Sequence, residues 1–271
     1  MHVQRPGAAD NESRVTRAIG AAAARTGVAF DFLLAQARIE SALDPDARAE
    51  TSSASGLFQF TRQTWLGTVH DFGRRHGLGW AADAIRQDAD GAHRIDDPEL
   101  ADAVLKLRDD PDAAAAMAAE FANANAGRLG EALGRDPEPV DLYLAHFLGP
   151  AGAVRFLTAH SAAPGSPAAP LFPDAARANR GVFFAADGSA RSLAEIRDGF
   201  AKRLASSAAA PVPAPAMSLP STPAFARRVA DTPAHDHVAS LIAIEPMPER
   251  LSLAYARRAY ERLAKLDGWQ R

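Results

Sequence analysis

The fold of this chain is decided by one stretch, Ala35-Gln36-Ala37-Arg38-Ile39-Glu40-Ser41-Ala42-Leu43-Asp44-Pro45. It closes a helix expected over residues 28–43, which carries apolar residues on more than one side and is therefore expected to be buried. Asp44-Pro45 stops that helix, because proline disfavours helical geometry in the residue before it. Beyond a polar loop, Gly56-Leu57-Phe58-Gln59 leads to a helix that Thr61 is expected to cap. Glu40 is therefore expected at the end of an apolar helix, directly before a loop.

Helices are expected along most of the first two hundred residues, because apolar residues recur there at helical spacing. Asn11 is expected to cap the first helix and Gly27 to end it. An irregular loop rich in proline is expected over residues 162–173. A small hairpin is expected over residues 182–191, around Asp187-Gly188. Ser192 is expected to cap a last helix. The remaining helices are expected over residues 98–108, 111–133, 139–148 and 151–160. The fold class is therefore mainly α.

The composition changes after residue 204. Residues 205–234 are rich in alanine and proline, which is typical of a semi-extended linker. Residues 235–271 predict a helical tail with one apolar stripe, and a short helix of this kind needs a surface to pack against. That surface is either the first domain or a protein partner. The chain is thus divided into a helical domain over residues 10–204, a proline-rich linker over 205–234 and a C-terminal helical tail over 235–271.

Composition excludes several classes of protein. The 271 residues carry a net charge of -3, so they lack the basic excess of a nucleic-acid-binding protein. No apolar run approaches the roughly 18 residues that a membrane span needs. Cysteine is absent, which excludes disulfides, zinc–thiolate sites and cysteine nucleophiles. The N-terminus has no apolar core of a signal peptide; the protein is expected to stay inside, to leave by another route, or to lack its leader in this chain.

Glu40 is the candidate catalytic residue. A carboxyl at the end of an apolar helix is poorly solvated, which favours its protonated form. A general acid that acts on a glycosidic oxygen near neutral pH needs that form. Taken alone, the same residue equally fits a glutamate that is turned to solvent or that caps a nearby amide.

The residues around Glu40 add a specific pattern. Glu40-Ser41 is followed by Pro45, then by Gly56-Leu57-Phe58-Gln59 after a serine-rich loop, then by Thr64. This combination resembles the catalytic domain of the lytic transglycosylases, relatives of goose-type lysozymes that cut the glycan strand of peptidoglycan. Phe58 stands where that family has methionine. The resemblance covers about residues 10–204 and implies a lysozyme-like helical domain.

The resemblance also implies a mechanism. Glu40 would protonate the oxygen between N-acetylmuramic acid and N-acetylglucosamine, and would then accept the proton of the muramyl C6 hydroxyl as a 1,6-anhydro ring closes. Ordinary glycosidases need a second carboxyl, which the internal hydroxyl makes unnecessary. Asp44 and Glu50 lie near in sequence, and either one as a second carboxyl would give a water-using muramidase instead. No metal and no cofactor is expected.

Seven residues are expected to contact the glycan. They are the loop residues Gly56, Leu57, Phe58 and Gln59, together with Ser41, Tyr143 and His146. The sequence departs from the family at Leu144-Ala145-His146-Phe147, where His146 and Phe147 replace a tyrosine and an asparagine. Tyr143 stands one helical turn earlier and could supply a phenol to the same groove.

Each of these residues also has a purely structural interpretation. Gly56 fits a positive φ or a close approach of sugar, and equally a plain loop glycine; Gln59 fits a sugar partner or an amide bonded within its own loop. Ser41 either orients Glu40 or caps the helix end. Phe58 and Trp65 favour the core over a stacking platform, and His146 is open between groove and core.

The expected partners are peptidoglycan glycan strands, reached in the periplasm or cell envelope, with a protein partner possible through the C-terminal helix. A non-cleaving glycan-binding or scaffold protein that kept the groove is an alternative. A secretion or phage protein whose enzyme domain clears a local gap is another. His235-Asp236-His237 resembles a metal-binding pair but lacks a placed third ligand, so it is interpreted as a solvated loop.

Overall fold

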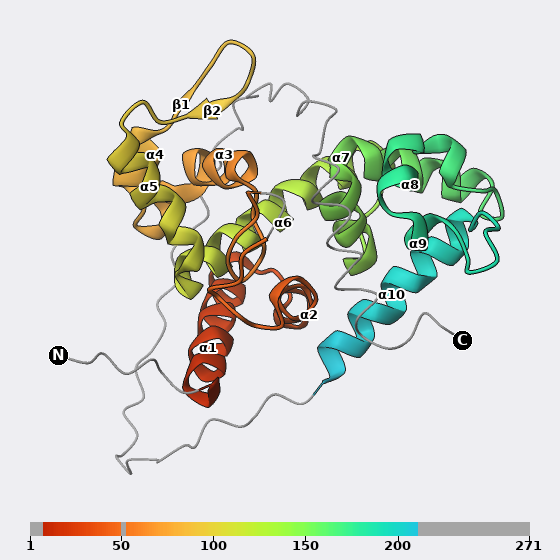
Figure 1. Cartoon of the computed structure of the whole chain (residues 1–271), viewed down its shortest axis with the longest axis horizontal. Helices are drawn as coiled ribbons and strands as arrows, with labels where there is room; N and C mark the ends of the chain where they lie inside the picture. The colour runs from red at the N-terminus through yellow and green to blue at the C-terminus, as the bar shows by residue number, and fades with distance from the viewer. Residues whose placement is uncertain (1–7, 50–52, 211–271) are drawn as a thin grey trace, which may run out of the picture.

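Helices form most of the protein in the computed structural model, which describes residues 8–49 and 53–210 (Figure 1). The mainly α fold class is therefore confirmed. The helices are α1 (Ala8–Thr26), α2 (Phe30–Ser41), α3 (Arg62–Phe72), α4 (Gly79–Ala84), α5 (Pro98–Lys106), α6 (Pro111–Leu133), α7 (Pro139–Ala162), α8 (Pro173–Ala178), α9 (Arg180–Phe183) and α10 (Leu193–Ala209). The 3₁₀ turns are η1 (Gly73–His76), η2 (Leu107–Asp109) and η3 (Ala169–Leu171), and β1 (Arg86–Gln87) pairs antiparallel with β2 (His93–Arg94). In the described part of the chain, no helix is both long and apolar enough to cross a bilayer.

Local sequence sets the start of several helices as predicted. The Thr61 side chain caps α3, and α6 begins at Pro111; Asp110, which was not predicted as a cap, caps α6. Ser192 and Glu195 form a reciprocal capping box at the start of α10, which satisfies two backbone N–H groups that a helix N-terminus leaves without partners. These bonds join residues within one turn, so they need no tertiary contact.

Helix α6 lies at the centre of the fold. Its residues 113–119 are all buried, and six of the seven are alanine, whose small side chain lets neighbouring helices approach closely. It packs against α1, α3 and α7. Figure 1 shows α6 crossing the middle of the molecule, with α1 and α3–α5 on one side and α7–α9 on the other.

The two helices expected over 139–148 and 151–160 join in α7 across a kink. The kink lies at Gly149, whose φ of 75° is outside the helical region, and Pro150 follows it. Proline lacks the N–H that a continuous helix would use, so the two halves diverge here. Gly149 and Pro150, the residues at the kink, line the cleft described below.

Helix α10 packs against both α2 and α7. Arg38 of α2 donates to the backbone carbonyl oxygens of Ser207 (2.6 Å) and Ala210 (2.9 Å), at the end of α10. Those carbonyls have no partner within the helix, so the guanidinium completes its C-terminus. The predicted linker start at residue 205 is wrong, because α10 continues to Ala209. Residues 211–234 of the linker and the tail over 235–271 lie outside the described residues.

Three further local predictions differ from the structure, the hairpin and the proline-rich loop only in part. Asn11 lies inside α1, which begins at Ala8, so it is not the cap. Val182 and Phe183 belong to α9 instead of a strand; both are buried, and their packing in the core overrides their preference for extended structure. The expected hairpin is present in a shorter form: Phe184 and Ala190 form an isolated antiparallel bridge, and the backbone N–H groups of Ala185 and Arg191 donate to the carbonyl oxygens of Ser189 and Phe183, each at 2.8 Å. The irregular loop expected over 162–173 contains the 3₁₀ turn η3.

Candidate functional site

Glu40 lies in the last turn of α2 and is 2% exposed. Helices α1, α6 and α10 pack around α2, so nine of its twelve residues are buried. The expectation that this helix is apolar and buried is confirmed. The carboxyl is therefore enclosed by protein and is not directed to solvent.

His146 is the polar neighbour of the Glu40 carboxyl. Its Nε2 lies 3.2 Å from Glu40 Oε1, and its Nδ1 lies 3.2 Å from Nε2 of Gln36. When the Gln36 amide donates to Nδ1, the ring proton is on Nε2 and faces the carboxylate. Gln36 stands one turn before Glu40, so both side chains share a face of α2. Three residues of α2 and α7 thus form one polar chain.

Tyr143 and Arg203 lie behind this chain. Tyr143 is 1% exposed; burial raises the pKa of its phenol, the nearby Glu40 carboxylate raises it further, and Arg203 opposes both effects. Burial lowers the pKa of Arg203, whereas Tyr143 and Glu40 raise it. A buried, neutral phenol and a half-buried guanidinium therefore lie within electrostatic reach of Glu40.

The loop after α2 is held by its own polar groups. The Ser41 hydroxyl donates to the carbonyl oxygens of Ala37 (3.0 Å) and Leu57 (2.8 Å), which ties the end of α2 to the loop. Gln59 has a positive φ of 49°, and its Nε2 donates to the carbonyl oxygens of Ala47 (3.1 Å) and Gly56 (2.9 Å). These contacts match the structural interpretations of Ser41 and Gln59.

Gly56 is required by a close approach of backbone. Its φ is 78°, and a Cβ built there would lie 1.9 Å from the carbonyl oxygen of Arg108. The expected positive φ is confirmed, but the chain that approaches Gly56 is η2 and not a ligand. This contact fixes the loop against η2.

A cleft of about 510 Å³, counted together with the solvent in its mouth, opens beside this loop. Three of the predicted glycan contacts line it: Phe58, Gln59 and His146. Its other lining residues come from α2, α3, α6 and α7 and the loop before α3: Gln36, Phe60, Thr61, Thr64, Ala118, Phe121, Ala145, Gly149 and Pro150. His146 connects this cleft to the enclosed Glu40.

The other predicted site residues lie behind the cleft wall. Glu40, Ser41, Gly56, Leu57 and Tyr143 do not line the cleft, and Leu57 and Tyr143 are at most 1% exposed. As the side chains stand, Leu57 and Tyr143 support the wall instead of meeting a ligand.

Trp65 and Phe58 are both core residues, as favoured. Trp65 is fully buried and donates from Nε1 to the Val104 carbonyl oxygen at 2.8 Å. Phe58 is 2% exposed and presents part of its ring to the cleft.

Asp44 makes its described contacts within its own turn. It is exposed, and its Oδ1 accepts from the backbone N–H of Asp46 at 2.9 Å. Glu50, the other proposed second carboxyl, lies outside the described residues, as does the group His235-Asp236-His237. Among the described residues, one group of three metal-ligating side chains lies close together, and it is not at the cleft: His70, Asp71 and His93.

Sequence reasoning missed Gln36 and Arg203. A polar residue four positions before Glu40 on an otherwise buried helix was the available signal for Gln36. Arg203 had no such signal, because its position beside Glu40 depends on how α10 packs against α2. No known protein-family model matches this chain.

Proposed function

We propose that this mainly helical domain has a lysozyme-like fold and cleaves the glycan strands of bacterial peptidoglycan, with Glu40 as the catalytic acid. The observation that carries the proposal is the continuity from Glu40 through His146 to a cleft that Phe58 and Gln59 also line. Of the motif that resembles lytic transglycosylases, Phe58, Gln59 and Thr64 line this cleft, and Glu40 adjoins it through His146. The expected place of action is the cell envelope, where the substrate lies.

The reaction requires one carboxyl in two protonation states. Protonated Glu40 gives its proton to the glycosidic oxygen, and the bond from that oxygen to the muramyl C1 breaks. The resulting carboxylate takes the proton of the muramyl C6 hydroxyl, whose oxygen bonds to C1 and closes the 1,6-anhydro ring. Because the nucleophile belongs to the substrate, its local concentration replaces a second carboxyl.

His146 positions the carboxyl in this scheme. It stands where the lytic transglycosylases have a tyrosine, and its ring lies between Glu40 and the cleft. A glycan reaches Glu40 when this ring turns from the carboxyl toward the cleft. The Gln36 amide, bonded to the other ring nitrogen, holds the ring in its closed orientation.

A non-cleaving glycan-binding protein is the second candidate, and the enclosure of Glu40 favours it. A carboxyl that is 2% exposed and lies 3.2 Å from a histidine nitrogen also fits a structural role in the cleft wall. In that case the chain holds glycan in the cleft without breaking it.

Mass spectrometry of muropeptides released from purified peptidoglycan separates these functions. We expect 1,6-anhydro ends from the wild-type chain and a loss of at least about a hundredfold in Glu40→Gln, because glutamine cannot transfer the proton. Reducing ends would indicate the muramidase, with Asp44→Asn and Glu50→Gln identifying its second carboxyl. No release, with retention of the chain on sedimented peptidoglycan, would identify the non-cleaving binder.

The chain offers a matched control for Glu40→Gln. Glu120 is also buried and bonded to a histidine, with its Oε1 at 2.7 Å from His76 Nε2, but neither residue lines the cleft. Glu120→Gln should retain glycan cleavage. Equal loss of activity in both variants, with equal loss of melting temperature, would show that a buried Glu–His pair serves folding and would contradict the catalytic role of Glu40.

A further inference from the structure

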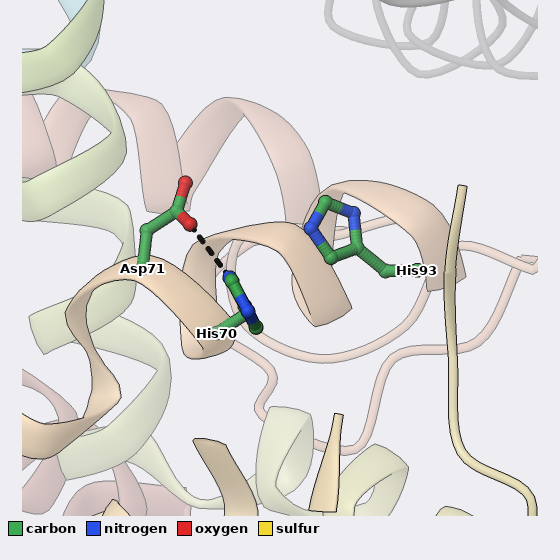
Figure 2. A group of neighbouring side chains, drawn as sticks. All are labelled: His70, Asp71 and His93. Carbon is green, nitrogen blue, oxygen red and sulfur yellow. Dashed lines mark hydrogen bonds and ion pairs between the residues drawn. The ribbon is translucent and has the colours of Figure 1, made fainter. Parts of the chain in front are cut away.

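Three side chains with metal-ligating atoms meet away from the cleft (Figure 2). His70 and Asp71 lie near the end of α3, and His93 lies on β2. One ligand atom from each residue lies within 4.8 Å of the other two. His70 Nδ1 is 2.8 Å from Asp71 Oδ1, and the His70 and His93 rings are 5.2 Å apart between centroids.

The fold fixes His93 beside α3 through its backbone. Gln63 of α3 donates from Nε2 to the His93 carbonyl oxygen at 2.9 Å, and its Oε1 accepts the His93 backbone N–H at 3.0 Å. Gly67, one turn after Gln63, leaves room for the imidazole: a Cβ there would lie 3.3 Å from two atoms of the ring. The β1–β2 hairpin therefore presents one histidine to α3 at a set position.

The ligand set matches one class of ion. Two imidazole nitrogens and one carboxylate oxygen are the donors that zinc and neighbouring divalent transition metals prefer, with water in the remaining positions. We propose that His70, Asp71 and His93 form a binding site for a divalent transition-metal ion such as Zn²⁺. The bound ion joins the β1–β2 hairpin to the end of α3.

Small side-chain rotations complete the site. Ligand bonds of about 2.0–2.2 Å keep any two ligand atoms within roughly 4 Å of each other, so the widest pair must close slightly. The side chains of His70 and Asp71 are 34% and 36% exposed, so they can rotate without displacing the core. The proposal does not depend on glycan cleavage, and its test reads metal binding directly.

Titration of the metal-free full chain with ZnCl₂, followed by calorimetry, tests the site. We expect one ion per chain and a melting temperature that rises by about 5–10 °C when free Zn²⁺ is a hundred times the dissociation constant. Titration with Co²⁺ should give the strong visible absorption of a four-coordinate ion. Failure to bind either ion with one-to-one stoichiometry would overturn the proposal.

Variants locate the site. His93→Ala, His70→Gln and Asp71→Asn should each weaken Zn²⁺ binding at least tenfold. His70 is half-buried and Asp71 is exposed, and neither belongs to the hairpin, so their variants test the site even where His93→Ala disturbs the hairpin. The control is the double variant His235→Ala, His237→Ala. It removes two histidines that are separated by a single residue in the sequence. Unchanged binding in that control is expected. Loss of binding in the control, or unchanged affinity in all three site variants, would refute the assignment.

Discussion

Replacement of Gly56 by alanine should destabilise the loop that carries Phe58 and Gln59. The new Cβ would lie 1.9 Å from the Arg108 carbonyl oxygen, a backbone atom that no side-chain rotation can move aside. Arg108 is itself held, because its guanidinium donates to the carbonyl oxygens of Ser53 (2.6 Å) and Phe60 (3.1 Å). The loop or η2 must therefore shift.

Two contributions set the magnitude. A residue with a Cβ at a positive φ costs about 1–2 kcal/mol, and forced overpacking typically adds about 1–3 kcal/mol. Since the close contact is with backbone, the upper part of the second range applies, and the sum is about 3–5 kcal/mol. For a domain of this size the melting temperature should fall by about 6–20 °C.

Gly77 supplies the matched control, because its φ is 76° and no atom lies within 4 Å of a Cβ built there. Gly77→Ala should cost only the contribution of the positive φ, about 1–2 kcal/mol. Urea unfolding followed by circular dichroism measures both variants. Equal free energies of unfolding for the two would refute the argument that the approach of Arg108 is rigid.

The end of α10 and the buried ion pairs give two further predictions. A chain cut after Ala210 keeps the carbonyls that Arg38 binds, whereas a cut after Leu204 removes them. The shorter chain should have a free energy of unfolding lower by at least about 2 kcal/mol, measured as a fall of about 4–8 °C in melting temperature. Equal melting temperatures for the two chains would contradict this prediction. Arg197→Ala should cost about 3 kcal/mol in urea unfolding, because it removes one of the cations from Asp141, which is 0% exposed. A change below about 0.5 kcal/mol, the ordinary range for a surface substitution, would show that the pair is not important for stability.

The site was predictable where it depends on neighbours in sequence. The apolar spacing of α2 placed Glu40 at the end of a buried helix, and the stop at Asp44-Pro45 placed a loop after it. The same local pattern allowed a positive φ at Gly56 as one of several interpretations. The residue that contacts Gly56 could not be predicted from this pattern. It is Arg108 of η2, and its carbonyl oxygen approaches Gly56 only because η2 packs on the loop.

His146 illustrates the same division at the cleft. Its sequence context left it open between groove and core, and the structure gives it both environments: His146 lines the cleft, and its Nε2 lies 3.2 Å from Glu40 Oε1. That arrangement arises because the packing of the helices brings His146 of α7 next to Glu40 of α2. A residue's neighbours along its own helix cannot specify this.

By itself, the sequence determined the helical class, the caps of α3 and α10, the start of α6 at Pro111, and the position of Glu40 at a helix end, since each depends on bonds or spacing within a few residues. Tertiary structure decided that α10 packs on α2, that Arg203 comes within electrostatic reach of Glu40, and that His93 meets His70. These pairings join segments that are distant along the chain, so they form only when the apolar faces of the helices are buried together. Burial is a property of the whole packed core, and for that reason no local pattern encodes them.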